Sequence, residues 1–462
     1  MNILKSYVDN IVNNGKGALT LSVENSKLKS NTITVNGYKH SMVQIICVAI
    51  AYNIKVKIVN APKVIDTYVF CKLIKKLGGV AKFSKNTLNI DPSGINDFKI
   101  DSNLSKLIHG SLYLMPALLI RLGQFEFGGA GGCQIEANKS RQYNHILNVM
   151  KQFGANIKIE NNIIKGEIYN FKEIKTIDIL EYSTNSKFLE GSAVGGATKT
   201  AILLSLNQRG VDILNPYLKT DVLDMLRFLQ ESGHNVNMKE NKISIGEKTK
   251  TNCKIVNFKL TQCISEIITY ITFAVLNNIN IKVKNLDRDR VELGLKPEFE
   301  LLNKINVKTR WNKNNLIVEK DSSILPHNIE VLPETIQSDH HPFFAIMLTK
   351  AGGVSKIVEN VYKFRFVYVE NLKKLGFNLI NENNTVIINP CKIMSVNNLS
   401  IEASDVRTGV VTLLGAIKTH SKINIKHGEH IFRGYDSIVK NLYKFGVKIS
   451  IKEEKNENSF YC

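Results

Sequence analysis

The chain has 462 residues, of which 44% are hydrophobic and 22% charged, which is typical of a globular protein too long for a single compact core. Its longest apolar runs, residues 42–52 and 112–122, are shorter than the roughly 18 residues that a membrane-spanning helix needs. A formal net charge of +20 favours anionic ligands in general without choosing among nucleic acid, membrane and small anions.

The cysteines and the N-terminal segment indicate a reduced compartment. Seven cysteines are scattered along the chain without a CxxC spacing, a pattern that suggests neither a disulfide framework nor a zinc knuckle. The first residues lack the apolar stretch and small-residue cleavage site of a secretory signal. We therefore expect a cytoplasmic protein with no bound metal and no cofactor.

One pattern of elements recurs six times along the chain. A helix ending in Gly is followed by two short β-like runs around an Asn- or Lys-rich turn. The copies are residues 75–91, 151–167, 230–247, 302–319, 373–389 and 443–454, of which the fourth lacks the Gly. Between them, an apolar helix running into a strand also recurs six times, at residues 49–62, 117–130, 203–216, 274–285, 347–360 and 415–428. The repeats predict two pseudo-symmetric α/β domains of three units each, with helices buried under sheets.

Three segments in the first half carry candidate site residues. In GGAGGCQIEANKSR, residues 128–141, glycines surround Cys133, and Lys139 and Arg141 would favour its thiolate or bind phosphate. Lys39, in VNGYKHS, stands at the start of an apolar helix, where its ammonium would meet an anion. Gly195 and Gly196 open a helix in AVGGATKT, which suits phosphate binding or tight packing. An inert thiol, a surface lysine and simple packing remain the alternatives.

The last third of the chain places arginines near predicted helix starts. Arg365, Arg407 and Arg433 occur in successive repeats that are otherwise rich in Lys, with Asp339 and Asp405 in neighbouring motifs. Arginine binds carboxylate and phosphate through two parallel hydrogen bonds, so these residues suggest an anion site at a cleft between domains. An internal Asp–Arg ion pair is the alternative for each of them.

Together the segments resemble the UDP-N-acetylglucosamine enolpyruvyl transferases and, more distantly, the enolpyruvylshikimate-phosphate synthases. The resemblance runs from about Leu19 to Lys452 and rests on eight motifs in the order of that family. These are NGYKHS, VNAPKVIDT, the GGC loop, VGGAT, QSDHHPFF, FRFVYV, SDVR and FRGYD. It implies a two-domain inverse α/β barrel built from six βαβαββ repeats. Its domains would be an N-terminal extension at 1–18, a C-terminal-type domain at 19–38 plus 262–458, and an inserted domain at 39–261 carrying the Cys133 loop.

The resemblance also implies roles for individual residues. Lys39 matches a lysine that contacts phosphoenolpyruvate, Cys133 a proton-donating thiol, and Asp339 the carboxylate that takes the proton of the acceptor hydroxyl. Arg365, Arg407 and Arg433 match the arginines that hold phosphoenolpyruvate, with Asp405 as the nearby acidic group. The nucleotide-sugar side is implied at His40, His109, Ser140, Arg141, Gln142, Tyr143, Asn144, Gly195, Gly196 and Val361.

Departures from the family pattern fall on the acceptor side. His40 replaces an Asn, His109 an Arg, and the loop after Cys133 is about three residues longer. We therefore predict carboxyvinyl transfer from phosphoenolpyruvate to UDP-N-acetylglucosamine with phosphate release, for peptidoglycan synthesis, and keep another uridine nucleotide as the alternative acceptor.

Two readings of a different class also remain. RNA 3′-phosphate cyclases use related repeats and a histidine near the C-terminus, for which His420, His427 and His430 are candidates. An inactive homologue that only binds ligand is the other. Neither a membrane nor a nucleic acid is the expected partner.

Overall fold

The chain divides into two compact units. Unit 1 comprises the described residues up to Asn36 and from Gln262 onward, and unit 2 those between Gly37 and Thr261. The computed structural model describes residues 3–14, 18–24, 27–131, 143–182, 191–248, 255–321, 323–362, 365–392, 396, 398–419 and 421–454. Within these ranges the chain leaves unit 1 after Asn36 and returns to it at Gln262.

Unit 2 contains three of the six four-stranded sheets found among the described residues. The first joins β14 (Val256–Lys259), β3 (Val56–Val59), β5 (Thr87–Asp91) and β4 (Val80–Ser84), with α2 (Lys39–Tyr52) and α3 (Ile65–Lys76). The second joins β6 (Lys99–Ile100), β7 (Gln124–Phe127), β9 (Ile163–Glu167) and β8 (Asn156–Glu160), with α4 (Ser102–Ser105), η1 (Gly110–Tyr113), α5 (Leu114–Leu122) and α6 (Asn144–Gln152). The third joins β10 (Thr176–Asp178), β11 (Val211–Leu214), β13 (Lys242–Lys248) and β12 (His234–Lys239), with η2 (Ile179–Tyr182), α7 (Gly191–Ser205) and α8 (Thr220–Glu231).

Unit 1 contains the other three sheets and, at its N-terminal end, α1 (Ile3–Asn14). One joins β16 (Thr309–Asn312), β17 (Asn315–Val318), β15 (Ile281–Val283) and β2 (Asn31–Ile33), with α9 (Ile264–Asn277), α10 (Arg288–Gly294) and α11 (Lys296–Lys304). Another joins β18 (Ile329–Val331), β19 (Ser355–Glu359), β21 (Thr385–Ile388) and β20 (Leu379–Glu382), with α12 (His341–Leu348) and α13 (Val367–Lys374). The last joins β22 (Leu399–Glu402), β23 (Ile423–Lys426), β1 (Ala18–Glu24) and β24 (Lys448–Glu454), with α14 (Val406–Lys418), η3 (Gly428–Arg433) and α15 (Ile438–Lys444).

The sheets share one pairing pattern, which is that of a βαβαββ repeat. In the sheet of β18 to β21, β18 and β19 are parallel, whereas β19–β21 and β21–β20 are antiparallel. A parallel pair needs a crossover helix, and α12 provides it. Strands from distant segments complete three sheets, because β14 pairs with β3, β2 with β15, and β1 with both β23 and β24. The predicted sixfold α/β organisation is therefore confirmed.

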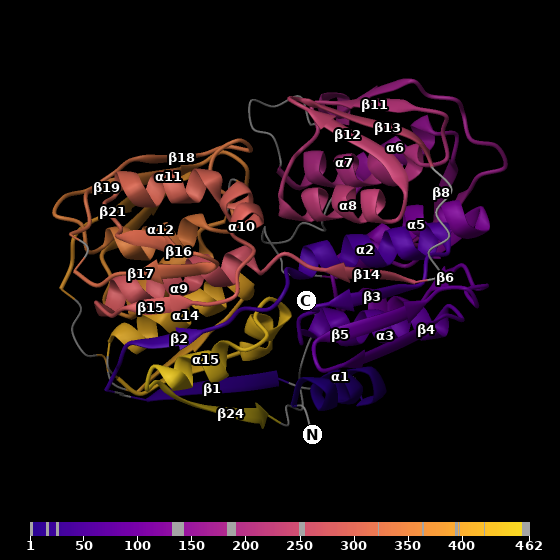
Figure 1. Ribbon diagram of the computed structural model, residues 1–462. Coiled ribbons are helices and arrows are strands. Elements are labelled where there is room, and N and C mark those ends of the chain that lie inside the picture. Colours follow the sequence, from indigo (N-terminus) through magenta and orange to yellow (C-terminus); the bar gives the residue numbers. More distant parts are fainter. Residues whose placement is uncertain are drawn as a thin grey trace. The chain divides into compact units, whose positions relative to one another are not determined.

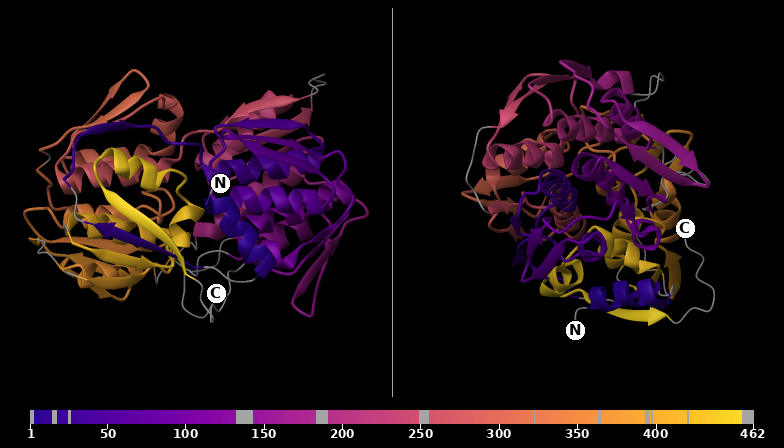
Figure 2. Two further views of the ribbon diagram at one scale, coloured as in Figure 1. Left: turned by 90° about the horizontal axis from the view of Figure 1, so that it is seen from below. Right: turned by 90° about the vertical axis from the view of Figure 1, so that its right-hand side faces the viewer.

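Apolar helices form the centre of each unit (Figure 1). In unit 2, α2, α5 and α7 contact one another, and in unit 1 α9, α12 and α14 do so. Along α9 nearly every residue from Ile264 to Leu276 is buried, and the same holds for α2 between Ser41 and Ala51. Helices that are apolar on all sides are stable only when they are surrounded by protein. Figure 2 shows the sheets on the outside of these helices.

Residues with a left-handed backbone end the helices that precede the hairpins. Gly78, Gly154, Gly233, Gly376 and Gly446 all have φ between +86° and +99°. In the fourth repeat, which lacks the Gly, Asn306 takes φ of +63°. Asn is the residue besides Gly that tolerates this conformation best. The repeat is thus conserved in backbone geometry even where its signature residue is missing.

Candidate functional site

A carboxylate in unit 1 lies between two arginines. Asp339 Oδ1 is 2.7 Å from Arg365 Nη2 and 2.7 Å from Arg407 Nη2. Its side chain is 30% exposed, whereas those of Arg365 and Arg407 are 8% and 17% exposed. The internal ion pair considered above as an alternative is therefore formed. It leaves two largely buried cations sharing one partly exposed carboxylate, which is an arrangement suited to further anions.

The position of Arg365 is set by a buried hydrogen-bond chain. Its Nη1 donates to Ser338 Oγ at 2.6 Å, and that hydroxyl donates to Glu359 Oε2 at 2.7 Å. The guanidinium also lies over the Tyr362 ring, 4.5 Å from its centroid. Burial raises the pKa of Glu359, and the charge of Arg365 and the Ser338 hydroxyl oppose this shift. The Nε of Arg365 is buried and has no hydrogen-bond partner within the described ranges.

Arg407 is presented by the start of α14. Asp405 is the N-cap of this helix and accepts from the backbone N–H of Arg407 at 2.8 Å and of Thr408 at 3.3 Å. Burial alone would raise the pKa of Asp405, but Arg407, the Thr408 hydroxyl and the cap bonds outweigh it and lower it. Asp405 therefore acts in this structure as a helix cap and as a second partner of Arg407, at 3.5 Å.

The other predicted residues of unit 1 lie in and beside short connecting segments. Arg433 is the last residue of η3, just before the start of α15 at Ile438, and is 9% exposed. Val361 follows β19, is buried, and donates its backbone N–H to Glu359 Oε1 at 2.7 Å. A shallow pocket over the arginine pair is lined by Pro342, Arg365, Val367, Tyr368, Asp405, Arg407 and Thr408.

Lys39 in unit 2 begins α2, as predicted, and pairs with a carboxylate. Its Nζ donates to Asp66 Oδ1 at 3.1 Å, and Asp66 is in the first turn of α3. The second oxygen, Asp66 Oδ2, is buried without a hydrogen-bond partner among the described residues. The His40 ring meets that of Tyr38 edge to face at 5.0 Å, and His109 is the N-cap of η1. Each side chain thus stands at the start of a helix.

A second lysine–aspartate pair of unit 2 was not predicted. Lys199 of α7 contacts Asp221, in the first turn of α8, at 2.7 Å, with side chains 12% and 11% exposed. Its ammonium also lies 4.9 Å from the centre of the Tyr113 ring. Burial by itself would lower the pKa of Lys199, but Asp221 and Tyr113 raise it. Burial would raise the pKa of Asp221, but Lys199 and His40 outweigh it and lower it. Asp221 is the repeat equivalent of Asp66, since both follow an Asn- and Pro-containing turn by a few residues. Comparing the repeats position by position would have found it.

The glycines of unit 2 serve packing. Gly196 lies inside α7 rather than at its opening, and a Cβ on it would come 2.1 Å from His145 Nε2. A Cβ on Gly128 would lie 2.2 Å from Ser102 Oγ, and one on Gly131 would lie 1.6 Å from the Lys106 carbonyl oxygen. The prediction that the Gly pair opens a helix is therefore wrong, because α7 starts several residues earlier.

Several predicted residues lie outside the described ranges, namely Cys133, Ser140, Arg141 and Gln142. Of the remaining residues in that segment, Tyr143 is the N-cap of α6, and Asn144 is its exposed first residue. Among the candidates for an RNA cyclase, His427 lies 3.3 Å from Glu429, and His420 is not described.

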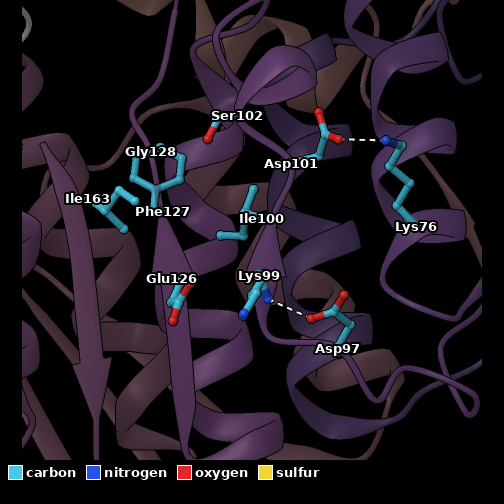
Figure 3. A pocket seen from close by; sticks show the side chains of 10 residues that line it. All are labelled: Lys76, Asp97, Lys99, Ile100, Asp101, Ser102, Glu126, Phe127, Gly128 and Ile163. Atoms are coloured by element: carbon cyan, nitrogen blue, oxygen red, sulfur yellow. Dashed lines mark hydrogen bonds and ion pairs between the residues drawn. The ribbon is translucent and has the colours of Figure 1, made fainter. Parts of the chain in front are cut away.

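A pocket of about 470 Å³ in unit 2 is lined by none of the predicted site residues that are described (Figure 3). It runs beside β6 and is bordered by the Lys76–Asp101 ion pair and by Phe127 and Gly128. Polar groups within it satisfy one another, since Asp97 also accepts from the backbone N–H of Lys99 at 2.9 Å. We therefore leave it outside the candidate site. Across the described residues, no helix combines the length and apolar character that crossing a membrane requires.

Comparison with known proteins decides the family. The sequence pattern of the family EPSP synthase (3-phosphoshikimate 1-carboxyvinyltransferase) matches residues 23–442. The chain belongs to this family. As a member of a carboxyvinyltransferase family it is an enzyme of the transferase class, as predicted.

Curated relatives match the chain over nearly its full length. It is 26% identical over 440 residues to a UDP-N-acetylglucosamine 1-carboxyvinyltransferase of Wolbachia pipientis, covering 92% of the chain and 98% of the relative. It is also 26% identical to the protein of that name from Aliarcobacter butzleri, covering 94% and 99%. The predicted resemblance to these transferases is confirmed.

Solved structures share the fold. The enolpyruvyl transferase NikO from Streptomyces tendae superposes with a TM-score of 0.86 at 25% identity, covering 95% of this chain and all of that one. EPSP synthase from Acinetobacter baumannii has a TM-score of 0.66 at 14% identity, covering 94% and 100%, and this likeness concerns the fold alone. The predicted two-domain inverse α/β barrel is confirmed by both.

Proposed function

We propose that the chain transfers the carboxyvinyl group of phosphoenolpyruvate to a hydroxyl of UDP-N-acetylglucosamine and releases phosphate. The observation that carries this proposal is the Asp339 carboxylate held between Arg365 and Arg407. A base beside two fixed cations matches a reaction between a hydroxyl and a small trianion. In a cell this step would supply peptidoglycan precursors, and we place it in the cytoplasm.

The reaction divides into an addition and an elimination, and both need acid–base groups. In the addition, the acceptor oxygen bonds to C2 of phosphoenolpyruvate, its proton passes to Asp339, and C3 gains a proton. In the elimination, C3 loses a proton, the double bond re-forms and phosphate leaves with the electrons of the C2–O bond. We assign the proton donation at C3 to Cys133, which lies outside the described residues.

The charges of phosphoenolpyruvate and of the leaving phosphate require fixed donors. We assign this role to Arg365, Arg407, Arg433 and Lys39. Arginine and lysine held by buried partners do not reorganise when charge develops in the transition state, and such preorganised electrostatics are a large part of enzymatic rate enhancement. Ser338, Asp405 and Asp66 are the groups that hold three of these four cations.

A second candidate acceptor is another uridine nucleotide. Histidines at positions 40 and 109 and the longer loop after Cys133 alter the residues assigned to the acceptor. The similarity to NikO, an enolpyruvyl transferase, at 25% identity supports enolpyruvyl transfer with either acceptor. Family membership does not support the RNA cyclase alternative.

The purified chain, incubated with phosphoenolpyruvate and a panel of acceptors, tests the proposal. We expect inorganic phosphate release with UDP-N-acetylglucosamine and a product whose mass exceeds that of the acceptor by one carboxyvinyl group. Release only with another uridine nucleotide would select the second candidate. Absence of release with every acceptor would support an inactive homologue and refute the proposal.

A further inference from the structure

Asp339 lies on a tight turn from which its carboxylate contacts both arginines. The turn runs from Gln337 to His340 and is closed by a hydrogen bond from His340 N to Gln337 O of 2.7 Å. α12 begins directly after it, at His341. A short side chain such as Asp has little freedom to compensate for a backbone shift, so the groups that hold the turn determine where its carboxylate lies.

One buried carboxylate binds both ends of this turn. Glu298, in α11, accepts from the Gln337 backbone N–H at 2.8 Å through Oε1. The same oxygen lies 2.8 Å from His340 Nδ1. The side chains of Glu298 and His340 are 1% and 0% exposed. Burying such a polar pair is costly unless its hydrogen bonds are made, and apolar residues of similar size would fill the space at lower cost.

The second nitrogen of the His340 ring is also held. Ser265, in the first turn of α9, places its Oγ 3.0 Å from His340 Nε2. A carboxylate accepts hydrogen bonds, so in the neutral ring Nδ1 donates to Glu298 and Nε2 accepts from the Ser265 hydroxyl. Contacts at both nitrogens fix the orientation of the ring, and with it the backbone next to Asp339.

We propose that Glu298 and His340 are positioning residues for Asp339. They keep the Gln337–His340 turn in the shape that brings Asp339 Oδ1 to within 2.7 Å of both guanidiniums. They act through the backbone of the turn, which Glu298 contacts at the Gln337 N–H and at the His340 ring. Their effect on turnover rests on the proposed function, in which Asp339 takes the acceptor proton, whereas their effect on the position of Asp339 does not.

The kinetics of Glu298 variants test the effect of this residue on turnover. Glu298→Leu removes both hydrogen bonds and is expected to lower kcat roughly 10- to 100-fold, because small misplacements of a catalytic group have costs of that size. The KM for phosphoenolpyruvate should change less than about threefold, since the arginines remain. Glu298→Gln keeps an accepting oxygen and should restore kcat to within about fivefold of the wild type.

A matched control separates positioning from general damage to the core. Thr272→Val removes a buried hydroxyl of α9 that donates within its own helix to the Ile268 carbonyl at 2.9 Å, and it should leave kcat unchanged. Should Glu298→Leu fail to fold, His340→Leu replaces it with the same expected loss of kcat. The proposal is overturned if Glu298→Leu, or His340→Leu in its place, has the wild-type kcat. It is also overturned if Glu298→Gln is as impaired as Glu298→Leu.

Crystal structures of the wild type and of Glu298→Leu, or of His340→Leu in its place, test the effect on the position of Asp339 without reference to activity. We expect at least one of the two contacts of Asp339 Oδ1, with Arg365 Nη2 or Arg407 Nη2, to lengthen beyond 4 Å, the usual limit for an ion pair. Retention of both contacts in the variant would refute the positioning role. If the wild-type enzyme turns over no acceptor, the proposed function is refuted instead. The distances from Asp339 Oδ1 to the two arginines would still test the positioning role of Glu298 and His340.

Discussion

At the scale of single residues, Asp339 is the group on which the proposed chemistry depends. Asp339→Asn keeps the side-chain size and removes the base, so we expect kcat to fall about 10²- to 10⁴-fold, the usual range for loss of general acid–base catalysis. Phosphate release would measure it. Asp287→Asn, at the N-cap of α10, is the control, because Asp287 caps a surface helix of the same unit. Turnover near the wild-type rate in Asp339→Asn would contradict the assigned base.

Glu266, in the first turn of α9, makes stability depend on pH. Burial and then the charge of Asp436 raise its pKa to about 8, from 4.5, although it accepts a hydrogen bond from the Asp436 backbone. Between these two values the unfolded chain has released this proton and the folded chain still binds it. The stability of the wild type due to this group therefore falls as pH rises from about 4.5 to about 8.

Glu266→Gln removes this titration. As pH rises across the same window, we expect the free energy of unfolding of the variant to increase relative to that of the wild type. The increase should be at most about 1.4 kcal/mol per pH unit. Urea unfolding at several pH values would measure the difference. Glu292→Gln, at an exposed carboxylate of α10, should show no such trend. A constant difference between Glu266→Gln and the wild type from pH 5 to pH 8, where the two states differ in bound protons, would refute the account.

The Lys199–Asp221 pair links two helices and tests a buried charge pair in unit 2. Lys199→Met leaves the Asp221 carboxylate nearly buried without its cation, so we expect a loss of about 3 kcal/mol in unfolding free energy. Replacing both residues by apolar ones should recover most of this loss. The control is Lys242→Met, since the Lys242–Asp212 pair is 42% and 40% exposed and should contribute no more than about 1 kcal/mol. If Lys199→Met loses no more unfolding free energy than Lys242→Met, the prediction is contradicted.

At the scale of elements, the helix-ending glycines have similar φ but different surroundings. At Gly376, φ is +87° and an added Cβ meets no atom within 4 Å. At Gly446, φ is +94° and an added Cβ lies 2.4 Å from the Lys27 carbonyl oxygen. Gly376→Ala should therefore cost only the left-handed conformation, roughly 1–2 kcal/mol, and Gly446→Ala clearly more. Denaturant unfolding of both variants measures this, and equal losses would show that the clash is relieved by movement of the chain.

The hairpins that follow these glycines explain why the repeats can be recognised in the sequence. Two of their turns contain two residues with positive φ in succession, Lys85 and Asn86 at +47° and +59°, and Asn161 and Asn162 at +50° and +62°. Two such residues in succession are the signature of a tight hairpin turn. Because this chemistry is local, the sequence predicts the helix end, the turn and the strand alternation in each repeat.

At the scale of the whole molecule, the two segments where the chain passes between the units are hydrogen-bonded to each other. Tyr38 N donates to Thr261 O at 2.8 Å, and Cys263 N donates to Asn36 O at 2.7 Å. Unit 2 therefore begins and ends with neighbouring segments, and its three sheets draw no strand from unit 1 within the described ranges.

Residues 37–261 are accordingly expected to fold when expressed alone. Unit 2 has its own apolar core around α2, α5 and α7, which is the property that defines an independent domain. The measurement is a cooperative thermal transition by circular dichroism, together with the absence of phosphate release. An isolated fragment without a cooperative transition would show that unit 2 needs unit 1 to fold.

By itself the sequence determined the six repeats, the fold class, the family and the start of α2 at Lys39, because each depends on local pattern or on ordered motifs. It also pointed to Asp339, Arg365 and Arg407 as site residues, through resemblance. Only the tertiary structure decided that one oxygen of Asp339 joins both arginines, that Lys199 meets Asp221, and that Glu298 holds the Asp339 turn. These contacts join residues that are 22 to 68 positions apart in the sequence. Such pairings depend on how strands and helices from different segments pack, and residue spacing along the chain carries no information about that.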